Sequence, residues 1–149
     1  VALLHWGSEY NDNISQSQKE ICKLMQEEGV NAIIGTHSHY VQQMTYDPET
    51  GNFVAYSLGD FISNGDRSGT EYSVVLKLEI TKNGTETKIT GYSYTPIFTV
   101  AERGSPLRSV RIAESMAAYD SNYIKGISQA TYDSMTYALT RIEARIKGE

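Results

Sequence analysis

Short apolar runs separate the polar stretches in the first third of this chain. The first run extends from Val1 to Leu4, and a second follows at Ala32-Ile33-Ile34. Runs of this length, uninterrupted by polar residues, are typical of strands that are buried on both faces. The pattern therefore predicts two buried strands near the N-terminus.

A helix is predicted between these two strands, from Ser15 to Glu28. Its apolar residues recur at helical spacing, at Ile21, Leu24 and Met25 with Cys22 beside them. Ser15 or Ser17 is suited to cap its start, and Gly29 stands where a helix-terminating glycine belongs. Strand, helix and strand in this order form a βαβ unit, whose two strands are parallel.

The middle of the chain alternates between apolar and polar residues. A turn at residues 46–52 precedes a third predicted strand from Phe53 to Leu58. Residues 72–81 alternate with period two, and only Val75 interrupts the polar face, which predicts a half-buried antiparallel strand. Asn83-Gly84 is a strong hairpin signal before a return strand over residues 88–100.

The C-terminal third returns to helical spacing. Pro96 predicts that the end of the return strand lies at a sheet edge or a bulge. A short helix is expected over Val110–Ala118 and a longer one over Ala130–Lys147. The longer helix carries an apolar stripe that we expect to pack on the sheet, at Tyr132, Met135, Leu139, Ile142 and Ile146. The fold class is therefore α/β, with a βαβ unit, an antiparallel hairpin and C-terminal helices.

Composition narrows the class of protein. The 149 residues, 40% hydrophobic and 21% charged, fit one globular domain over residues 1–149. A net charge of −5 without a basic cluster argues against nucleic acid as a partner. The single cysteine, Cys22, excludes an intrachain disulfide and is expected to be a small buried apolar residue. Because the sequence opens on a strand without Met, we expect it to be the later part of a longer protein.

The candidate chemistry lies in the histidines. All three, His5, His37 and His39, come at or just after a predicted strand end. Ligands bind at the carboxyl ends of strands in open α/β sheets, and imidazole is a common transition-metal ligand. If the chain is extended there, His37 and His39 point to the same side and can face one ion or two adjacent ions. The alternative is that they are loop histidines that only form hydrogen bonds with neighbours.

Three segments resemble the poly-γ-glutamate capsule-biosynthesis (CapA-like) family. They are the HWGSEY segment at residues 5–10, GTHSHYV at residues 35–41 and YSLGDFI at residues 56–62. The family belongs to the calcineurin-like metallophosphoesterase superfamily, an αββα sandwich with a dinuclear metal centre. The resemblance implies that this chain is the C-terminal half of such a domain and that two divalent ions, of Mn, Fe, Zn or Mg, bind in the intact protein. It also implies that His5 and His37 bind one metal and His39 the other, with the remaining ligands in a preceding half.

Several positions near these motifs bear on that expectation. Ser38 replaces the family's usual proline, which predicts a less rigid turn, and Asp60 replaces its usual asparagine, which adds a negative charge. Glu9 is a candidate to orient His5 through its second ring nitrogen. Trp6, Tyr10 and Asp60 are weaker candidates for contact with substrate; packing is the alternative for the two aromatic residues.

The expected function is that of a metal-dependent hydrolase in capsule biosynthesis, acting on a phosphoester or in poly-γ-glutamate synthesis. The fragment alone is expected to bind metal weakly and to turn over little. The alternatives are a non-catalytic accessory or polymer-binding protein on the same fold, and a stand-alone domain with one structural ion. The resemblance further implies, as partners, the missing N-terminal half and a capsule-synthesis membrane complex, and the cell envelope as location.

Overall fold

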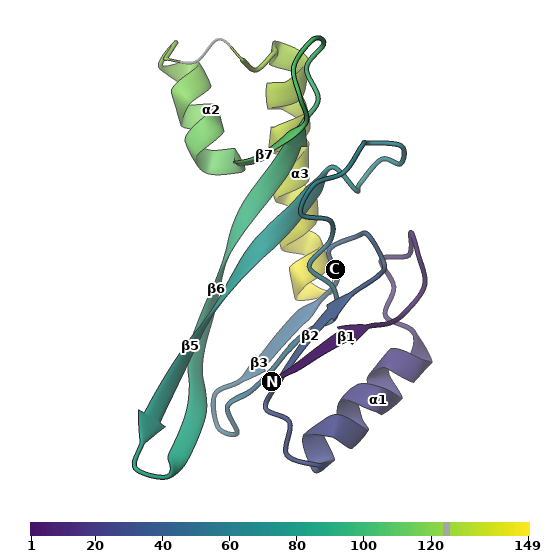
Figure 1. Cartoon of the computed structure of the whole chain (residues 1–149), viewed down its shortest axis with the longest axis vertical. Coiled ribbons are helices and arrows are strands. Elements are labelled where there is room, and N and C mark those ends of the chain that lie inside the picture. Colours follow the sequence, from purple (N-terminus) through teal and green to yellow (C-terminus); the bar gives the residue numbers. More distant parts are fainter. Residues whose placement is uncertain (124–125) are drawn as a thin grey trace.

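The computed structural model of the chain describes residues 1–123 and 126–149. It is an α/β structure with two sheets and three helices (Figure 1). In chain order the elements are β1 (Ala2–His5), α1 (Gln16–Glu27), β2 (Ala32–Thr36), β3 (Met44–Asp47), β4 (Asn52–Ala55), β5 (Tyr72–Asn83), β6 (Glu86–Val100), β7 (Arg108–Arg111), α2 (Ile112–Asp120) and α3 (Gln129–Lys147).

The first sheet contains the predicted βαβ unit. Its strand order is β1-β2-β4-β3, in which β1, β2 and β4 are parallel and β3 is antiparallel to β4. The third predicted strand ends at Ala55 rather than Leu58. Strand β3, which forms a hairpin with β4 around residues 48–51, was not predicted from the sequence. Strand β1 lies at the edge of this sheet.

Helix α1 covers one face of the first sheet. Ser15 caps the helix in a capping box with Gln18, as a serine at that position favours. The buried residues of α1 are Gln18 and Cys22, whereas Ile21 and Leu24 remain 41% and 58% exposed. The predicted helix and the burial of Cys22 are confirmed, and Cys22 with Met25, rather than Ile21 and Leu24, packs with the core beneath the helix.

The second sheet is built on a long hairpin. Strands β5 and β6 pair from Tyr72–Phe98 to Asn83–Glu86 with a bulge at Glu79/Ile80, and β7 adds to β6 at Ile97–Val100. The predicted hairpin is confirmed. Pro96 lies inside β6 rather than at its end, directly before the residues that pair with β7. On that side of β6 the proline occupies a locally unpaired position, where its missing N–H costs no ladder hydrogen bond.

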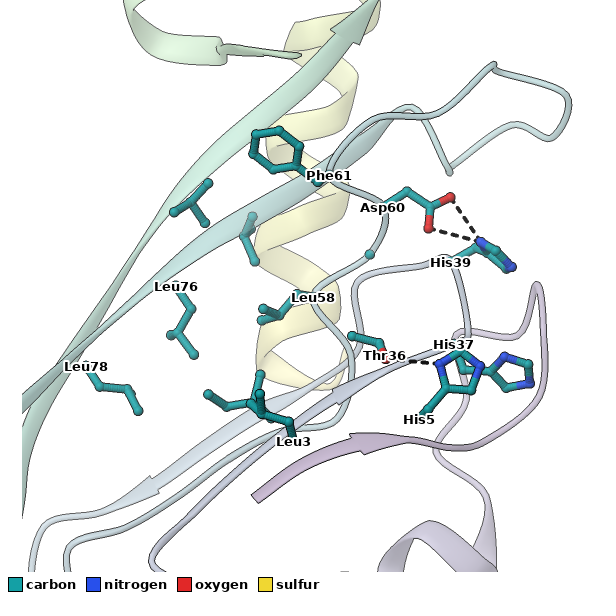
Figure 2. A pocket seen from close by; sticks show the side chains of 14 residues that line it. Leu3, His5, Thr36, His37, His39, Leu58, Asp60, Phe61, Leu76 and Leu78 are labelled. Carbon is teal, nitrogen blue, oxygen red and sulfur yellow. Dashed lines mark hydrogen bonds and ion pairs between the residues drawn. The ribbon is translucent and has the colours of Figure 1, made fainter. Parts of the chain in front are cut away.

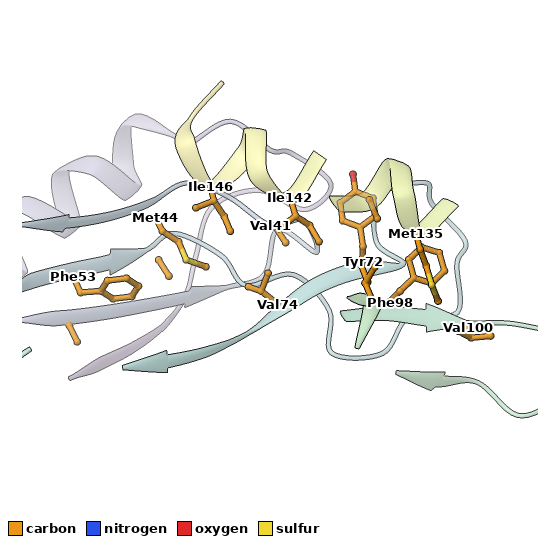
Figure 3. Packing of buried hydrophobic residues seen from close by; sticks show 14 of the residues in the cluster. Val41, Met44, Phe53, Tyr72, Val74, Phe98, Val100, Met135, Ile142 and Ile146 are labelled. Atoms are coloured by element: carbon orange, nitrogen blue, oxygen red, sulfur yellow. The ribbon is translucent and has the colours of Figure 1, made fainter. Parts of the chain in front are cut away.

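Helix α3 joins the two sheets into one core. Its apolar stripe faces the sheets as predicted, with Met135, Ile142 and Ile146 buried against residues such as Val41 and Phe98 (Figure 3). The predicted shorter helix is present as α2 and begins after β7, a strand the sequence did not reveal. Neither α3 nor any other helix within the described ranges combines the length and the apolar character that a membrane crossing needs.

The two faces of the first sheet are unevenly covered, and this leaves a hollow beside strand β1. Alternation along the parallel strands puts Leu4 and Ile33 on the face toward α1, and Leu3 and Ile34 on the opposite face. The core around α3 and the second sheet covers that opposite face at the β4 side, where Phe53 is fully buried. At the β1 edge the same face stays open, and Leu3 is 75% exposed.

Candidate metal-ligand site at the strand ends

Two of the three histidines meet where the parallel strands end. His5 is the last residue of β1 and is paired in register with Thr36, the last residue of β2, so that His37 follows immediately. The ring centroids of His5 and His37 lie 4.3 Å apart, tilted by 44° (Figure 2). The Nδ1 atom of His5 lies 3.3 Å from the hydroxyl of Thr36. The parallel register of β1 and β2 therefore brings together two residues that are 32 positions apart in the sequence.

The segment with His37 and His39 is not extended, so the condition under which the two side chains would point to the same side is not met. His37 has φ of 103° and His39 has φ of 62°, both in the left-handed region that non-glycine residues rarely adopt. Ser38 between them is fully buried, and its hydroxyl accepts from the N–H of Tyr40 and donates to the carbonyl of Tyr40. Ser38 thus supplies by hydrogen bonds the rigidity expected from the family's proline. Such strain at adjacent candidate ligands is typical of functional sites.

Asp60 holds His39. Both carboxylate oxygens of Asp60 lie 3.0 Å from His39 Nδ1. An ionised carboxylate only accepts, so Nδ1 carries the proton and Nε2 is the nitrogen left for another ligand. Glu9 lies on that second side, with Oε1 3.8 Å from His39 Nε2. The expectation that Glu9 orients His5 is therefore wrong, because the loop that carries Glu9 folds toward His39.

A network of glutamines and backbone bonds fixes the loop that carries Glu9. The N–H of Tyr10 donates to the carbonyl of Ser38 at 2.8 Å, and the Tyr10 ring stacks on His39 with centroids 4.7 Å apart. The buried Gln18 donates to Gln42, which in turn donates to the carbonyls of Asn11 and Asn13. This buried relay from α1 to the loop could not be read from the sequence, since glutamines are mostly exposed.

Trp6 lies in the core rather than on a substrate-facing surface. It is 8% exposed, and its indole N–H donates to the carbonyl of Tyr56 at 2.8 Å. Gly35 passes beneath this contact, and a Cβ atom there would collide with both the Tyr56 carbonyl and the Trp6 ring. On the same side, burial and the nearby Cys22 thiol raise the pKa of Tyr56 to about 12.

A cavity of about 680 Å³ opens in front of the histidines (Figure 2). Its polar end holds all three histidines with Thr36 and Asp60, and its remaining wall is mostly apolar. That wall is formed by Leu3, Ile34, Leu58, Phe61, Val74, Val75, Leu76 and Leu78. Phe61 is 69% exposed and Val75 45% exposed. Val75, the only apolar interruption of the polar face of its strand, was the one sequence signal for this wall.

A family model and individual proteins both match this chain, and both concern capsule biosynthesis. Residues 1–65 match the family described as "Bacterial capsule synthesis protein PGA_cap". Residues 1–65 therefore belong to the CapA-like family of capsule biosynthesis proteins. The chain is 30% identical over 85 residues to "PGA biosynthesis protein CapA" of Bacillus subtilis (strain 168), an overlap that covers 57% of this chain and 22% of that protein. It is 32% identical over 85 residues to "Capsule biosynthesis protein CapA" of Bacillus anthracis, an overlap of 57% and 20%.

This chain spans about a fifth of the length of the curated CapA relatives it matches. The CapA-like region contains all three histidines, Glu9 and Asp60. Half of the apolar wall of the cavity comes from β5, beyond residue 65. The cavity is thus formed jointly by the CapA-like region and the second sheet.

The candidate metal donors fall into two groups. His5 and His37 form one pair, and His39, oriented by Asp60 through Nδ1, has Glu9 beside its Nε2. Within residues 1–123 and 126–149, however, no three His, Cys, Asp or Glu side chains are grouped so that they could hold a metal ion. The imidazoles have the right chemistry for divalent transition metals.

Proposed function

We propose that this chain contributes His5, His37 and His39 to a divalent-metal hydrolase centre of a longer CapA-like capsule biosynthesis protein. His5 and His37 would hold one ion and His39 the other. Two ions of this kind would supply Lewis acidity and an activated water. The substrate class is a phosphoester or a bond handled during poly-γ-glutamate synthesis.

The contact between the rings of His5 and His37 is the observation that carries this proposal. Side chains from two parallel strands converge at 4.3 Å, at the end of the sheet where α/β proteins bind ligands. Core packing does not account for the contact, because His5 is exposed and His37 only partly buried. The positive φ of His37 adds a backbone cost that a purely structural role would not require.

Asp60 supports a ligand role for His39. Metal-binding histidines commonly donate their other ring N–H to a carboxylate, which fixes the tautomer and orientation of the ring. His39 has this arrangement through Nδ1. In this proposal Asp60 positions His39 and does not itself touch the substrate.

The remaining ligands would come from another part of the longer protein. The open face at β1 supports this, because parallel sheets are normally covered on both faces. Leu3 is 75% exposed on that face, and β1 is an unpaired edge. We propose that a further part of the CapA-like polypeptide covers this face, that the protein acts with a capsule-synthesis membrane complex, and that it works at the cell envelope.

A second candidate function is that of a non-catalytic polymer-binding or accessory protein. The observation that favours it is the incomplete donor set within the described residues. Under this alternative the cavity would hold polymer or a partner subunit, and the histidines would form hydrogen bonds to it. Metal binding distinguishes the two functions.

The test is calorimetric titration of the 149-residue chain with Mn²⁺ and with Zn²⁺. We expect weak binding by the unaltered chain and loss of that binding in His37→Ala and in His39→Ala. Glu27→Gln, which removes an exposed carboxylate from α1, is the matched control and should leave binding unchanged. Equal affinity in all four proteins would contradict the proposed ligand set.

A further inference from the structure

A second cavity lies on the other side of His39. Its volume is about 310 Å³, and it shares His39 and Asp60 with the larger cavity. The rest of its wall comes from Tyr10 and the loop over residues 62–70, including Arg67. The two cavities thus meet at the His39–Asp60 pair.

Arg67 is held in this cavity by a three-layer stack. Its guanidinium carbon lies 4.2 Å from the centroid of the Tyr10 ring, and Tyr10 in turn stacks on His39, nearly parallel at 12°. A guanidinium that lies over a ring keeps its N–H donors in its own plane, directed outward. These donors match the paired oxygens of a carboxylate or a phosphate.

The loop that carries Arg67 is tied down on both sides of it. The carbonyl of Arg67 accepts from both the N–H and the hydroxyl of Thr70, at 3.2 Å and 2.8 Å. The Tyr40 hydroxyl donates to the carbonyl of Ser68 at 3.1 Å. The buried hydroxyls of Ser63 and Thr70 are 2.8 Å apart and close the base of the loop. Arg67 is therefore positioned by the fold and not only by its own side chain.

The carboxylates around the cavity do not pair with the Arg67 guanidinium, which can therefore bind an anion of a ligand. Two acidic residues line it, and each has a partner: Asp60 accepts from His39, and Asp66 accepts from the Asn64 amide at 2.6 Å. Within the part of the chain that the structure describes, no carboxylate lies within 4.0 Å of the Arg67 guanidinium nitrogens.

We propose that Arg67 forms an anion subsite next to His39, which takes a carboxylate or phosphate group of the ligand. This subsite proposal rests on the proposed function only in that the reacting part of the same ligand would lie at His39. Arg67 follows the matched family region and is a residue of the loop that separates the two sheets. A polymer with regularly spaced carboxylates would place one group at Arg67 and a neighbouring group at the histidines.

The experiment measures ligand binding to the 149-residue chain without metal, by nuclear magnetic resonance titration. The probes are a short γ-linked glutamate oligomer and inorganic phosphate, which separate the two sources of the anion. We expect at least one probe to shift the resonances of Arg67, Tyr10 and His39. Arg67→Gln should weaken that binding by about tenfold or more, because two charge-assisted hydrogen bonds are lost. Arg67→Lys should fall between, since it keeps the charge but not the planar donor pair.

Arg103→Gln is the matched control, because it removes the same charge from an exposed loop. Binding that falls equally in Arg67→Gln and Arg103→Gln would reveal only a general charge effect and would overturn the subsite. Failure of both probes to bind the unaltered chain would overturn it as well. Because no metal is present, a failed metal titration leaves this result unaffected.

Discussion

Both carboxylate oxygens of Asp60 lie 3.0 Å from Nδ1 of His39. Asp60 follows Gly59 in the polar loop between the sheets, and His39 lies in the strained turn after β2. The pair therefore joins two segments that are 21 residues apart in the sequence. It also separates the large cavity at the strand ends from the smaller one that contains Arg67.

Removal of the Asp60 carboxylate should change the tautomer of His39. In Asp60→Ala we expect a mixture of the Nδ1–H and Nε2–H forms, because the fixed acceptor is gone, whereas Asp60→Asn keeps one acceptor oxygen and should retain more of the Nδ1–H form. Nitrogen chemical shifts of the His39 ring measure this directly. Any metal affinity of the chain should fall by about 10- to 100-fold in Asp60→Ala. Glu27→Ala, on the exposed side of α1, is the control, and an unchanged His39 spectrum in Asp60→Ala would contradict the role of Asp60.

Gly35→Ala should destabilise the fold strongly. The added methyl group would collide with the Tyr56 carbonyl and the Trp6 ring, which are joined by a hydrogen bond in the core. We expect a loss of about 3 kcal/mol or more in the free energy of unfolding, at or above the upper end for overpacked core sites. Urea denaturation measures it.

Gly65→Ala is the control for this substitution. Gly65 has φ of 76°, but apart from Gly65 and its two chain neighbours no residue has a heavy atom within 4 Å of the place that the added methyl group would occupy. The left-handed backbone alone should therefore cost about 1–2 kcal/mol. If Gly35→Ala and Gly65→Ala lowered the free energy of unfolding equally, the close contacts at Gly35 would not contribute to the effect.

Gln18→Ala should loosen the loop that carries Glu9 and Tyr10. The substitution removes the donor to Gln42 and the acceptor for the N–H of Ser15, both inside the protein. We expect a loss of about 1–3 kcal/mol in the free energy of unfolding, because buried polar groups are left unpaired. Hydrogen exchange at the Tyr10 N–H should also become faster.

The same helix offers the control, Gln16→Ala. Gln16 is exposed and contacts only the Glu20 side chain among the described hydrogen bonds. Its loss should change the free energy of unfolding by less than about 0.5 kcal/mol. If Gln18→Ala were equally mild, the glutamine relay would not be what fixes the loop.

Ionisation of Tyr56 should weaken the fold in alkaline solution. Burial is the main reason that its pKa rises from 10 to about 12 in the folded chain. Tyr56 in the unfolded chain ionises near pH 10, so its contribution is fully present below that pH and is lost as the pH rises to about 12. The measurement is the free energy of unfolding of the unaltered chain and of Tyr56→Phe between about pH 9 and 12, which we expect to fall more steeply in the unaltered chain. Parallel curves would contradict the raised pKa.

Local sequence patterns were sufficient for most of the regular elements. The Val1–Leu4 and Ala32–Ile34 runs, the Asn83-Gly84 turn and the 3-4 spacing from Met135 to Ile146 each act over a few residues, so that they predict a strand, a hairpin or a helix directly. The histidines were also found this way, since all three follow an apolar run. That they jointly bind metal, and that the chain is one domain within a longer one, stay predictions.

The tertiary structure decided which partners those residues have. The parallel register of β1 and β2 placed the ring of His5 against that of His37. The fold of the loop after β1 placed Glu9 beside His39 rather than beside His5. Strands β3 and β7 are stabilised by pairing with neighbours and have no strong local signal of their own. The physical reason is that side-chain periodicity depends on adjacent residues, whereas the contacts of a loop depend on burial and hydrogen bonding across the whole fold.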